Sequence, residues 1–407
     1  MLETFSKNQD LFRGSIQSMD KQAIAKALLW LQGDTPYPYP TSIHLNLTLR
    51  CTARCLHCRQ WTWPIHSEFT ISQVHQLFSI FERWGVKTIT FGGGNPLLYE
   101  HIGLALQIAH QANIQVGIIS EGINISEEIA EAICQYASWI RFSLDGYSAD
   151  IHDKIRNVPG LFNKVIRNIR QLKTYRGQIS IGLNCVVQKR NVSTLSQMVE
   201  LAERLEIDTL LFKMSHGNDD SGHFLLSVNE WKQFVEWVNS TSVRGTTSVK
   251  TNLNELRTLI DLIFTEKDVA QGKPVHSFYI NEQVYCFAPL FFLTCDSEGN
   301  MYPCDYLQAD TRVWEGEYGD MRRKFCLGNV LDDSQQVLNK LAIMLRDSIH
   351  NLPTIGYGEC GCCTRFCQLN AVLSKMKQDL SSRSMTEQSI IEYLIKFESE
   401  QPESNFL

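Results

Sequence analysis

The chain has 407 residues, of which 43% are hydrophobic and 20% charged, and its net charge is −6. This length suffices for two or three domains around a large core, and the hydrophobic content excludes a disordered chain. The negative net charge argues against nucleic acid as the main partner. The longest apolar run, near residues 287–293, is too short to span a bilayer, and residues 1–7 lack the apolar stretch of a signal peptide. We therefore expect a cytoplasmic protein with no membrane partner.

The first predicted element is a helix over residues 17–32, which ends before Pro36, Pro38 and Pro40. After it, short runs rich in β-branched and aromatic residues alternate with amphipathic stretches. Strands are predicted at 43–47, 88–91, 115–119, 139–144, 179–187 and 209–213, and helices at 71–84, 101–111, 126–136, 161–174, 192–205 and 228–238. Six βα units indicate an α/β protein whose parallel sheet curls into a full or partial barrel.

Cysteine positions and the segments between them suggest the domain organisation. We expect a helical preface over 1–40, a partial (β/α)6 barrel over 41–240 and a helical linker over 241–280. A small cysteine-rich α+β extension over 281–370 and a C-terminal helix and tail over 371–407 follow, with the helix at 385–397.

Cys51, Cys55 and Cys58 form a C-x3-C-x2-C motif on the loop after the first predicted strand. In a reducing compartment, clustered cysteines indicate a metal rather than disulfides. A 4Fe–4S cluster normally takes four cysteine thiolates, so a compact triad leaves one iron open to an exogenous ligand. A zinc site completed by His57 or by a distant ligand is the alternative.

Two further motifs follow later strands and fall at the same edge of the predicted sheet. The loop 92–96 reads Gly-Gly-Gly-Asn-Pro, and its glycines permit close backbone approach to an amino-acid head group, although such a loop is also an ordinary turn. Ser143 and Asp145 at the end of the fourth strand place a hydroxyl and a carboxylate at this edge, either for a ligand or as helix caps.

Together these motifs, over about residues 40–215, resemble the radical S-adenosylmethionine (SAM) superfamily. The resemblance implies that the cysteine triad holds a 4Fe–4S cluster and that the amino and carboxylate groups of SAM bind the open iron. His57 occupies the aromatic-type position before the last cysteine. Gly93, Gly94 and Asn95 resemble the family's Gly-Gly-Glu-Pro motif, which contacts the SAM amino group. Because Asn95 replaces the glutamate, we expect backbone carbonyls to carry more of that contact.

The same resemblance extends to two downstream segments. Residues 143–146 and 152–156 are similar to the family's Ser-Leu-Asp-Gly and His-Asp-x-x-Arg segments. Arg156 is then implied to pair with the SAM carboxylate, with a surface salt bridge as the alternative. Ser120 and Glu121, at the end of the third strand, are further candidates of this kind.

A second group of cysteines lies in the C-terminal part of the chain, where a hairpin turn is predicted around Gly299. The spacing resembles the twitch and SPASM extensions of radical SAM enzymes, although the full seven-cysteine SPASM pattern is not matched. It implies one auxiliary 4Fe–4S cluster, and a zinc hairpin is the alternative. The expected ligands are Cys286, Cys304, Cys360 and Cys363, with Cys295 and Cys367 as substitutes.

Two cysteines in the same region, Cys326 and Cys362, have no ligand role in this scheme. A thiol there could donate a hydrogen atom to a substrate radical, as in radical epimerases, or could only pack.

The resemblance implies an enzyme that cleaves SAM and takes a hydrogen atom from a ribosomally made precursor peptide, ending in epimerisation, a crosslink or another oxidation. A flavodoxin or ferredoxin would supply electrons. Leader binding is expected from the barrel, the C-terminal region or a separate partner protein. The alternatives are a dehydrogenase or epimerase of a sugar or aminocyclitol, and a non-catalytic iron–sulfur scaffold.

Overall fold

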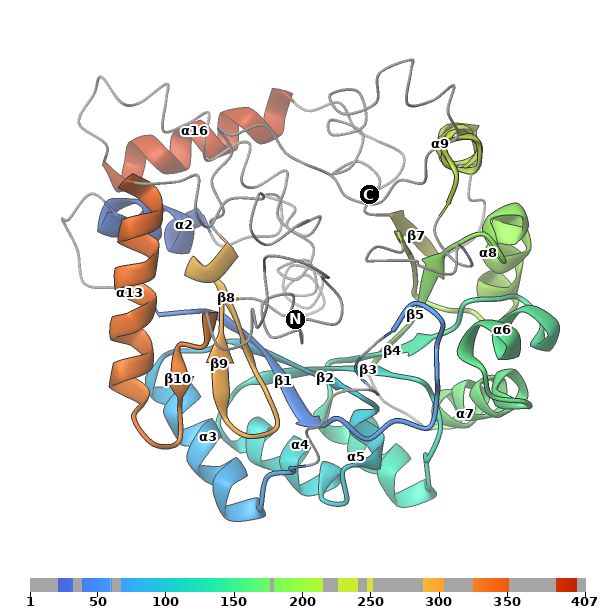
Figure 1. Cartoon of the computed structure of the whole chain (residues 1–407), viewed down its shortest axis with the longest axis horizontal. Coiled ribbons are helices and arrows are strands. Elements are labelled where there is room, and N and C mark those ends of the chain that lie inside the picture. The colour runs from blue at the N-terminus through green and yellow to red at the C-terminus, as the bar shows by residue number, and fades with distance from the viewer. Residues whose placement is uncertain are drawn as a thin grey trace.

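The computed structural model describes residues 21–31, 39–58, 60, 67–175, 179–214, 226–240, 247–251, 288–303, 325–350 and 386–400. Their strands form one sheet in the order β10-β9-β8-β1-β2-β3-β4-β5-β6-β7. Strands β1 to β7 are parallel and follow chain order. Their bounds are β1 Ser42–Thr48, β2 Thr88–Gly93, β3 Gln115–Ser120, β4 Trp139–Ser143, β5 Ser180–Val187, β6 Thr209–Met214 and β7 Ser248–Thr251. The predicted α/β class and partial barrel are confirmed, and Figure 1 shows the sheet curving with helices on its outer side.

The outer helices connect successive strands and bury one apolar face each against the sheet. They are α3 Ile71–Arg83, α4 Ile102–Gln111, α5 Glu127–Tyr136, α7 Leu161–Thr174 and α8 Leu195–Arg204, with α9 Val228–Ser240 after β6. Helix α3 begins with a capping box between Thr70 and Gln73, which satisfies its first free amides.

Helix α6 (Ala149–Arg156) was not predicted from the sequence. It has eight residues, and only a few apolar positions such as Ile151 and Ile155, too few to produce a helical period. It ends at Asn157, whose φ of 55° is the left-handed conformation that stops a helix. This short helix returns the chain to the loop after β1.

Parallel pairing sets the position of the functional loops. All seven residues of β1 are buried, so this strand lies in the middle of the core. Because β1 to β5 are parallel, their carboxyl ends lie along one edge of the sheet, and the loops that follow them converge there.

The region after residue 240 differs from expectation in two respects. Strand β7 lies inside the segment expected to be a helical linker; four residues are too few for a period to identify. Strand β8 (Phe292–Cys295) pairs parallel with β1, and β9 (Asn300–Tyr302) and β10 (Gly328–Asn329) continue antiparallel. The predicted hairpin turn joins β8 to β9, with Gly299 at φ 91°. The described strands of the extension therefore continue the barrel sheet.

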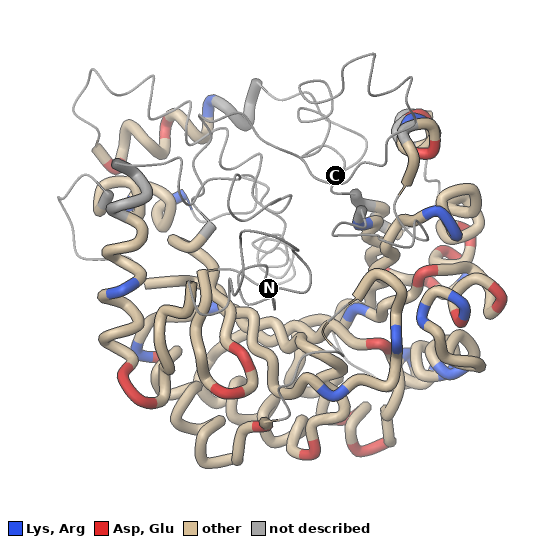
Figure 2. The backbone as a smooth tube through the Cα atoms, in the orientation of Figure 1, with Lys and Arg blue, Asp and Glu red and all other residues tan. Residues whose placement is uncertain are grey.

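Three helices pack together beside this end of the sheet. Helix α2 (Lys21–Leu31) contacts both α13 (Ser334–His350) and α16 (Glu387–Glu400), and Leu28 and Trp30 of α2 are buried. Helices α2 and α16 were predicted at 17–32 and 385–397, whereas α13 was not. Figure 2 shows Lys and Arg positions interspersed with Asp and Glu positions along the backbone of the outer helices. No helix within the described ranges is long and apolar enough to cross a membrane.

Candidate functional site

The loop after β1 carries the three cysteines, and its backbone is bonded to α6. The amide of Arg54 donates to the carbonyl of Arg156 at 3.0 Å, and the amide of Leu56 donates to the carbonyl of Ile155 at 3.2 Å. These are carbonyls of the last turn of α6, which intrahelical bonds leave free. The unpredicted helix therefore supports the cysteine loop.

The glycine loop after β2 holds the other side of the cysteine loop. The amide of Gly94 donates to the carbonyl of Thr48 at 3.1 Å, and that of Asn95 donates to the carbonyl of Arg50 at 2.7 Å. A Cβ on Gly94 would lie 2.3 Å from the Arg50 carbonyl oxygen, and Gly93 has a φ of 94°. The glycines thus permit two loops to touch along their backbones, and these two amides are already used within the protein.

Asn95 is fully buried, and its side chain is engaged at both ends. Its Oδ1 accepts from the Leu97 amide at 3.3 Å and from the Ser120 hydroxyl at 2.8 Å. Its Nδ2 donates to Glu121 Oε1 at 3.2 Å. Asn95 therefore caps the short turn after β2 and connects it to the end of β3.

Glu121, only 4% exposed, is the carboxylate at the centre of this group. Besides the Asn95 amide, it accepts from the Thr52 hydroxyl at 2.9 Å and from the amides of Thr52 and Ala53 at 3.3 and 3.1 Å. The Cys51 thiol donates to its Oε2 at 3.6 Å. The sequence marked Glu121 as one further candidate, and the structure gives it a direct contact with a predicted iron ligand.

A second buried carboxylate, Asp145, lies after β4 and forms an ion pair. Its Oδ2 is 2.6 Å from Arg156 Nε, and its Oδ1 accepts from the Val186 amide at 2.8 Å. Burial, the largest single effect, would raise the pKa of Asp145, but Arg156, His57, His152 and the Val186 amide together outweigh it and hold the pKa below its ordinary value. Arg156 Nη1 also donates to Cys55 Sγ at 3.5 Å. Arg156 therefore belongs to a buried ion pair, not to a surface salt bridge.

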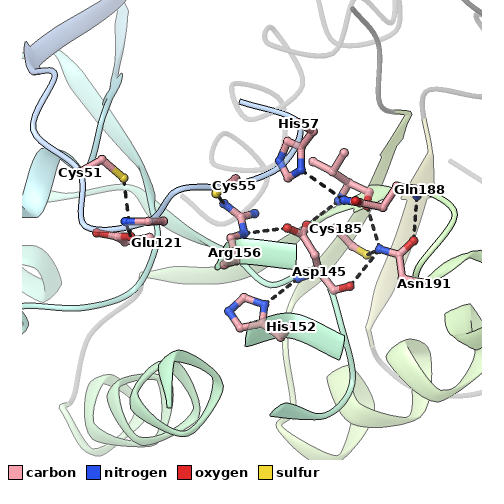
Figure 3. A network of polar contacts seen from close by, with 12 residues as sticks. Cys51, Cys55, His57, Glu121, Asp145, His152, Arg156, Cys185, Gln188 and Asn191 are labelled. Atoms are coloured by element: carbon pink, nitrogen blue, oxygen red, sulfur yellow. Dashed lines mark hydrogen bonds and ion pairs between the residues drawn. The ribbon is translucent and has the colours of Figure 1, made fainter. Parts of the chain in front are cut away.

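Figure 3 shows how the β5 end completes this network. Asn191 Nδ2 donates to the carbonyl of Asp145 at 2.9 Å, and Asn191 Oδ1 accepts from the Gln188 amide at 2.8 Å. Gln188 Nε2 lies 3.2 Å from Nδ1 of His57 on the cysteine loop. The Asp145 amide donates to His152 Nδ1 at 3.1 Å. Sequence reasoning missed Gln188 and Asn191; their position just after a parallel strand was the available signal.

The electrostatic surroundings of the thiols fit a bound metal cluster. Burial raises the pKa of Cys51 to about 12, with Glu121 as the second cause, and burial raises the pKa of Cys55 to about 11. Thiolates here need added positive charge, which iron supplies when it binds them. In the described part of the chain, no three Cys, His, Asp or Glu side chains converge on a point that a single ion could occupy.

The remaining predicted residues are not among the contacts described above. Ser143 lies half-buried at the end of β4, opposite Asn184. Cys295, at the end of β8, is fully buried in the hydrophobic core, and Cys326 is half-buried just before β10. Six other predicted cysteines lie outside the described residues: Cys286, Cys304, Cys360, Cys362, Cys363 and Cys367.

Fold and site together define an α/β protein with a cysteine triad at the carboxyl edge of its parallel sheet. Residues 45–202 match the Radical SAM superfamily. The chain therefore carries a radical SAM domain, as the resemblance of its motifs predicted.

Relatives of known function lie at low identity. The chain is 27% identical over 281 residues to an AdoMet-dependent heme synthase of Oleidesulfovibrio alaskensis, covering 65% of this chain and 69% of that protein. It is 26% identical over 301 residues to the mycofactocin maturase MftC of Mycobacterium tuberculosis, covering 72% and 68%.

Solved structures share the fold. The chain is similar to SuiB of Streptococcus suis bound to S-adenosylmethionine, with a TM-score of 0.61 and 15% identity over 84% of this chain and 77% of that one. It is also similar to AdoMet-bound anSMEcpe, with a TM-score of 0.56 and 16% identity over 88% and 100%.

Proposed function

We propose that this chain is a radical SAM enzyme whose Cys51, Cys55 and Cys58 hold a SAM-binding 4Fe–4S cluster. The observation that carries the proposal is the cysteine loop itself, which is bonded to α6 on one side and to the glycine loop on the other. Such a loop presents three thiols at the edge of the sheet where the ends of β3 and β4 bring two carboxylates and α6 brings a guanidinium.

When bound, the cluster and SAM supply a 5′-deoxyadenosyl radical that removes a hydrogen atom from the substrate. The chain's own residues fix the geometry. Glu121 fastens the start of the cysteine loop, and Arg156 lies against Cys55 while Asp145 compensates its charge. Gly93, Gly94, Asn95, Ser120, Ser143 and His57 complete the proposed cofactor-binding edge.

The substrate we propose is a ribosomally made precursor peptide. MftC is named a mycofactocin maturase, and SuiB has been solved bound to the precursor peptide SuiA. Epimerisation of a residue is the proposed outcome, with crosslinking or another oxidation as the alternatives.

The C-terminal cysteines extend this proposal. In a crosslinking or another oxidation, one auxiliary 4Fe–4S cluster on Cys286, Cys304, Cys360 and Cys363, with Cys295 or Cys367 as substitute ligands, would accept the electron that the product radical loses. Cys326 or Cys362 would donate the hydrogen atom that completes an epimerisation.

A second candidate is a reaction on a tetrapyrrole, because relatives in three organisms are named AdoMet-dependent heme synthases. Peptide and tetrapyrrole substrates can be separated by incubating the reconstituted enzyme with each. The substrate that accelerates 5′-deoxyadenosine formation identifies the class. A rate that neither substrate changes would contradict both.

The first test is anaerobic iron and sulfide analysis with EPR, with and without SAM. The triple variant Cys51→Ala/Cys55→Ala/Cys58→Ala should lose about four irons and its response to SAM, whereas wild type with both clusters should hold about eight. Cys134→Ala, which removes a half-buried thiol of α5, is the matched control and should match wild type. Zinc in place of iron, or an EPR signal indifferent to SAM, would contradict the proposal.

A further inference from the structure

The two buried carboxylates of the site differ in what balances their charge. Asp145 has Arg156 at 2.6 Å. Glu121 accepts hydrogen bonds from one side-chain amide, two backbone amides, a hydroxyl and a thiol, all of them neutral. Among the described residues, Glu121 has no Lys, Arg or His within ion-pair distance. A carboxylate this deeply buried is expected to face a cation.

We propose that Glu121 is the acceptor for the α-ammonium of SAM and that it supplies the negative charge absent at position 95. This inference rests on the proposed function. SAM brings an ammonium to the open iron, next to the cysteine loop, and Glu121 touches that loop at Cys51, Thr52 and Ala53. The carboxylate comes from the end of β3, one strand beyond the glycine loop.

The contacts of Asn95 support this assignment. Its oxygen is already occupied by Leu97 and Ser120, so it has little capacity for a ligand. Its nitrogen donates to Glu121 Oε1, which places the amide of one strand end and the carboxylate of the next in direct contact. Compared with the Gly-Gly-Glu-Pro motif, the negative charge in this chain therefore lies on Glu121, the hydrogen-bond partner of Asn95, and is still in the site.

Iron binding also changes the hydrogen bonds of Glu121. A sulfur that ligates iron carries no hydrogen, so the Cys51 donor to Oε2 is lost when the cluster is present. Oε2 then keeps the Ala53 amide and has one donor fewer. An ammonium restores that donor and offsets the negative charge of the adjacent thiolate.

The experiment compares SAM affinity per cluster, by anaerobic equilibrium dialysis, in reconstituted wild type and variants. Glu121→Gln keeps the shape and removes the charge. Asn95→Asp/Glu121→Gln returns the charge to the other side of the same hydrogen bond. Asp208→Asn is the control, because Asp208 accepts from the Ile181 amide at 2.7 Å near the amino end of β5, away from the loops. A second ligand, 5′-methylthioadenosine, lacks the ammonium.

We expect Glu121→Gln to raise the dissociation constant of SAM at least about tenfold, as for loss of a hydrogen bond to a charged group. The double variant should recover most of the lost SAM affinity. Asp208→Asn should bind SAM as wild type does, and every variant should bind 5′-methylthioadenosine with the affinity of wild type. Any of four results would overturn the inference and leave Glu121 as an anchor of the loop. These are unchanged SAM affinity in Glu121→Gln, an equal loss of affinity for both ligands, no recovery of affinity in the double variant, or complete loss of iron from Glu121→Gln. Failure of wild type to bind SAM would instead contradict the proposed function.

Discussion

The functional edge of the sheet has two halves, each with a buried carboxylate, and the two halves stabilise the negative charge in different ways. At β4 and β5, Asp145 and Arg156 neutralise each other within the protein, and Asn191 and His152 satisfy the surrounding backbone. At β1 to β3, Glu121 is held by neutral donors and by loops packed along their backbones. The half at β4 and β5, in which Asp145 and Arg156 cancel each other's charge, has a structural role whether or not a ligand is bound. The half with an uncompensated carboxylate is the one adapted to a cationic ligand.

The largest effect should come from breaking the ion pair of the first half. Arg156→Met would leave Asp145 buried without its cation, which lowers the free energy of unfolding by about 3–5 kcal/mol. Urea denaturation measures this. Lys154→Met, which removes an exposed partner 4.0 Å from Asp150, is the control and should have an effect near zero. If both variants lower the free energy of unfolding by similarly small amounts, Arg156 and Asp145 do not neutralise each other in the folded protein.

In the half at β1 to β3, Gly94→Ala tests the backbone contact between the glycine loop and the cysteine loop. The new Cβ would meet the carbonyls of Arg50 and Leu49, which must move, so the free energy of unfolding should fall by up to about 3 kcal/mol. The variant should also retain less iron. Gly103→Ala in α4 meets only Ala132 at 3.6 Å, an ordinary contact, and should be neutral or slightly stabilising. If both glycines tolerate alanine equally, the two loops do not depend on close approach.

Acid should weaken the β4–β5 half through His152. Burial lowers the pKa of His152 to about 4 from an ordinary value near 6.5, so the unfolded chain binds a proton that the folded chain does not. Stability is therefore complete above about pH 6.5 and declines as the pH falls toward 4. Between pH 7 and pH 5, the titration of His152 should lower the free energy of unfolding by about 2 kcal/mol.

The measurement is the difference in unfolding free energy between pH 7 and pH 5 for wild type and His152→Gln. The variant should lose less stability on acidification. An identical pH dependence would show that His152 is not the group that titrates.

The smallest effect is expected at the exposed start of the cysteine loop. Arg50 Nε lies 2.6 Å from Glu68 Oε1, but the Arg50 side chain is 53% exposed, so solvent screens the pair. A double-mutant cycle with Arg50→Met and Glu68→Gln should give a coupling energy below about 1 kcal/mol. A larger value would mean that this contact, rather than Glu121, fastens the loop.

The sequence by itself determined the strands of the barrel and the order of its motifs. Buried parallel strands are continuous apolar runs, and helices repeat every 3.6 residues, so both are visible locally. Strand order along the chain was therefore enough to place the cysteine triad and the loops at 92–96 and 143–146 at one edge of the sheet. Helix α6 and strand β7 are too short to produce a period, and they were missed.

Only the tertiary structure decided which side chains meet. Glu121 and Asn95 lie 26 residues apart, and Asp145 and Asn191 belong to loops after different strands; parallel pairing brings each pair together. The sequence showed that Asn95 replaces an acidic residue, but not that a carboxylate from the next strand touches it. Periodicity reports which face of an element is buried, whereas the charge balance of a site depends on contacts between elements, and those are fixed by the packing of the sheet.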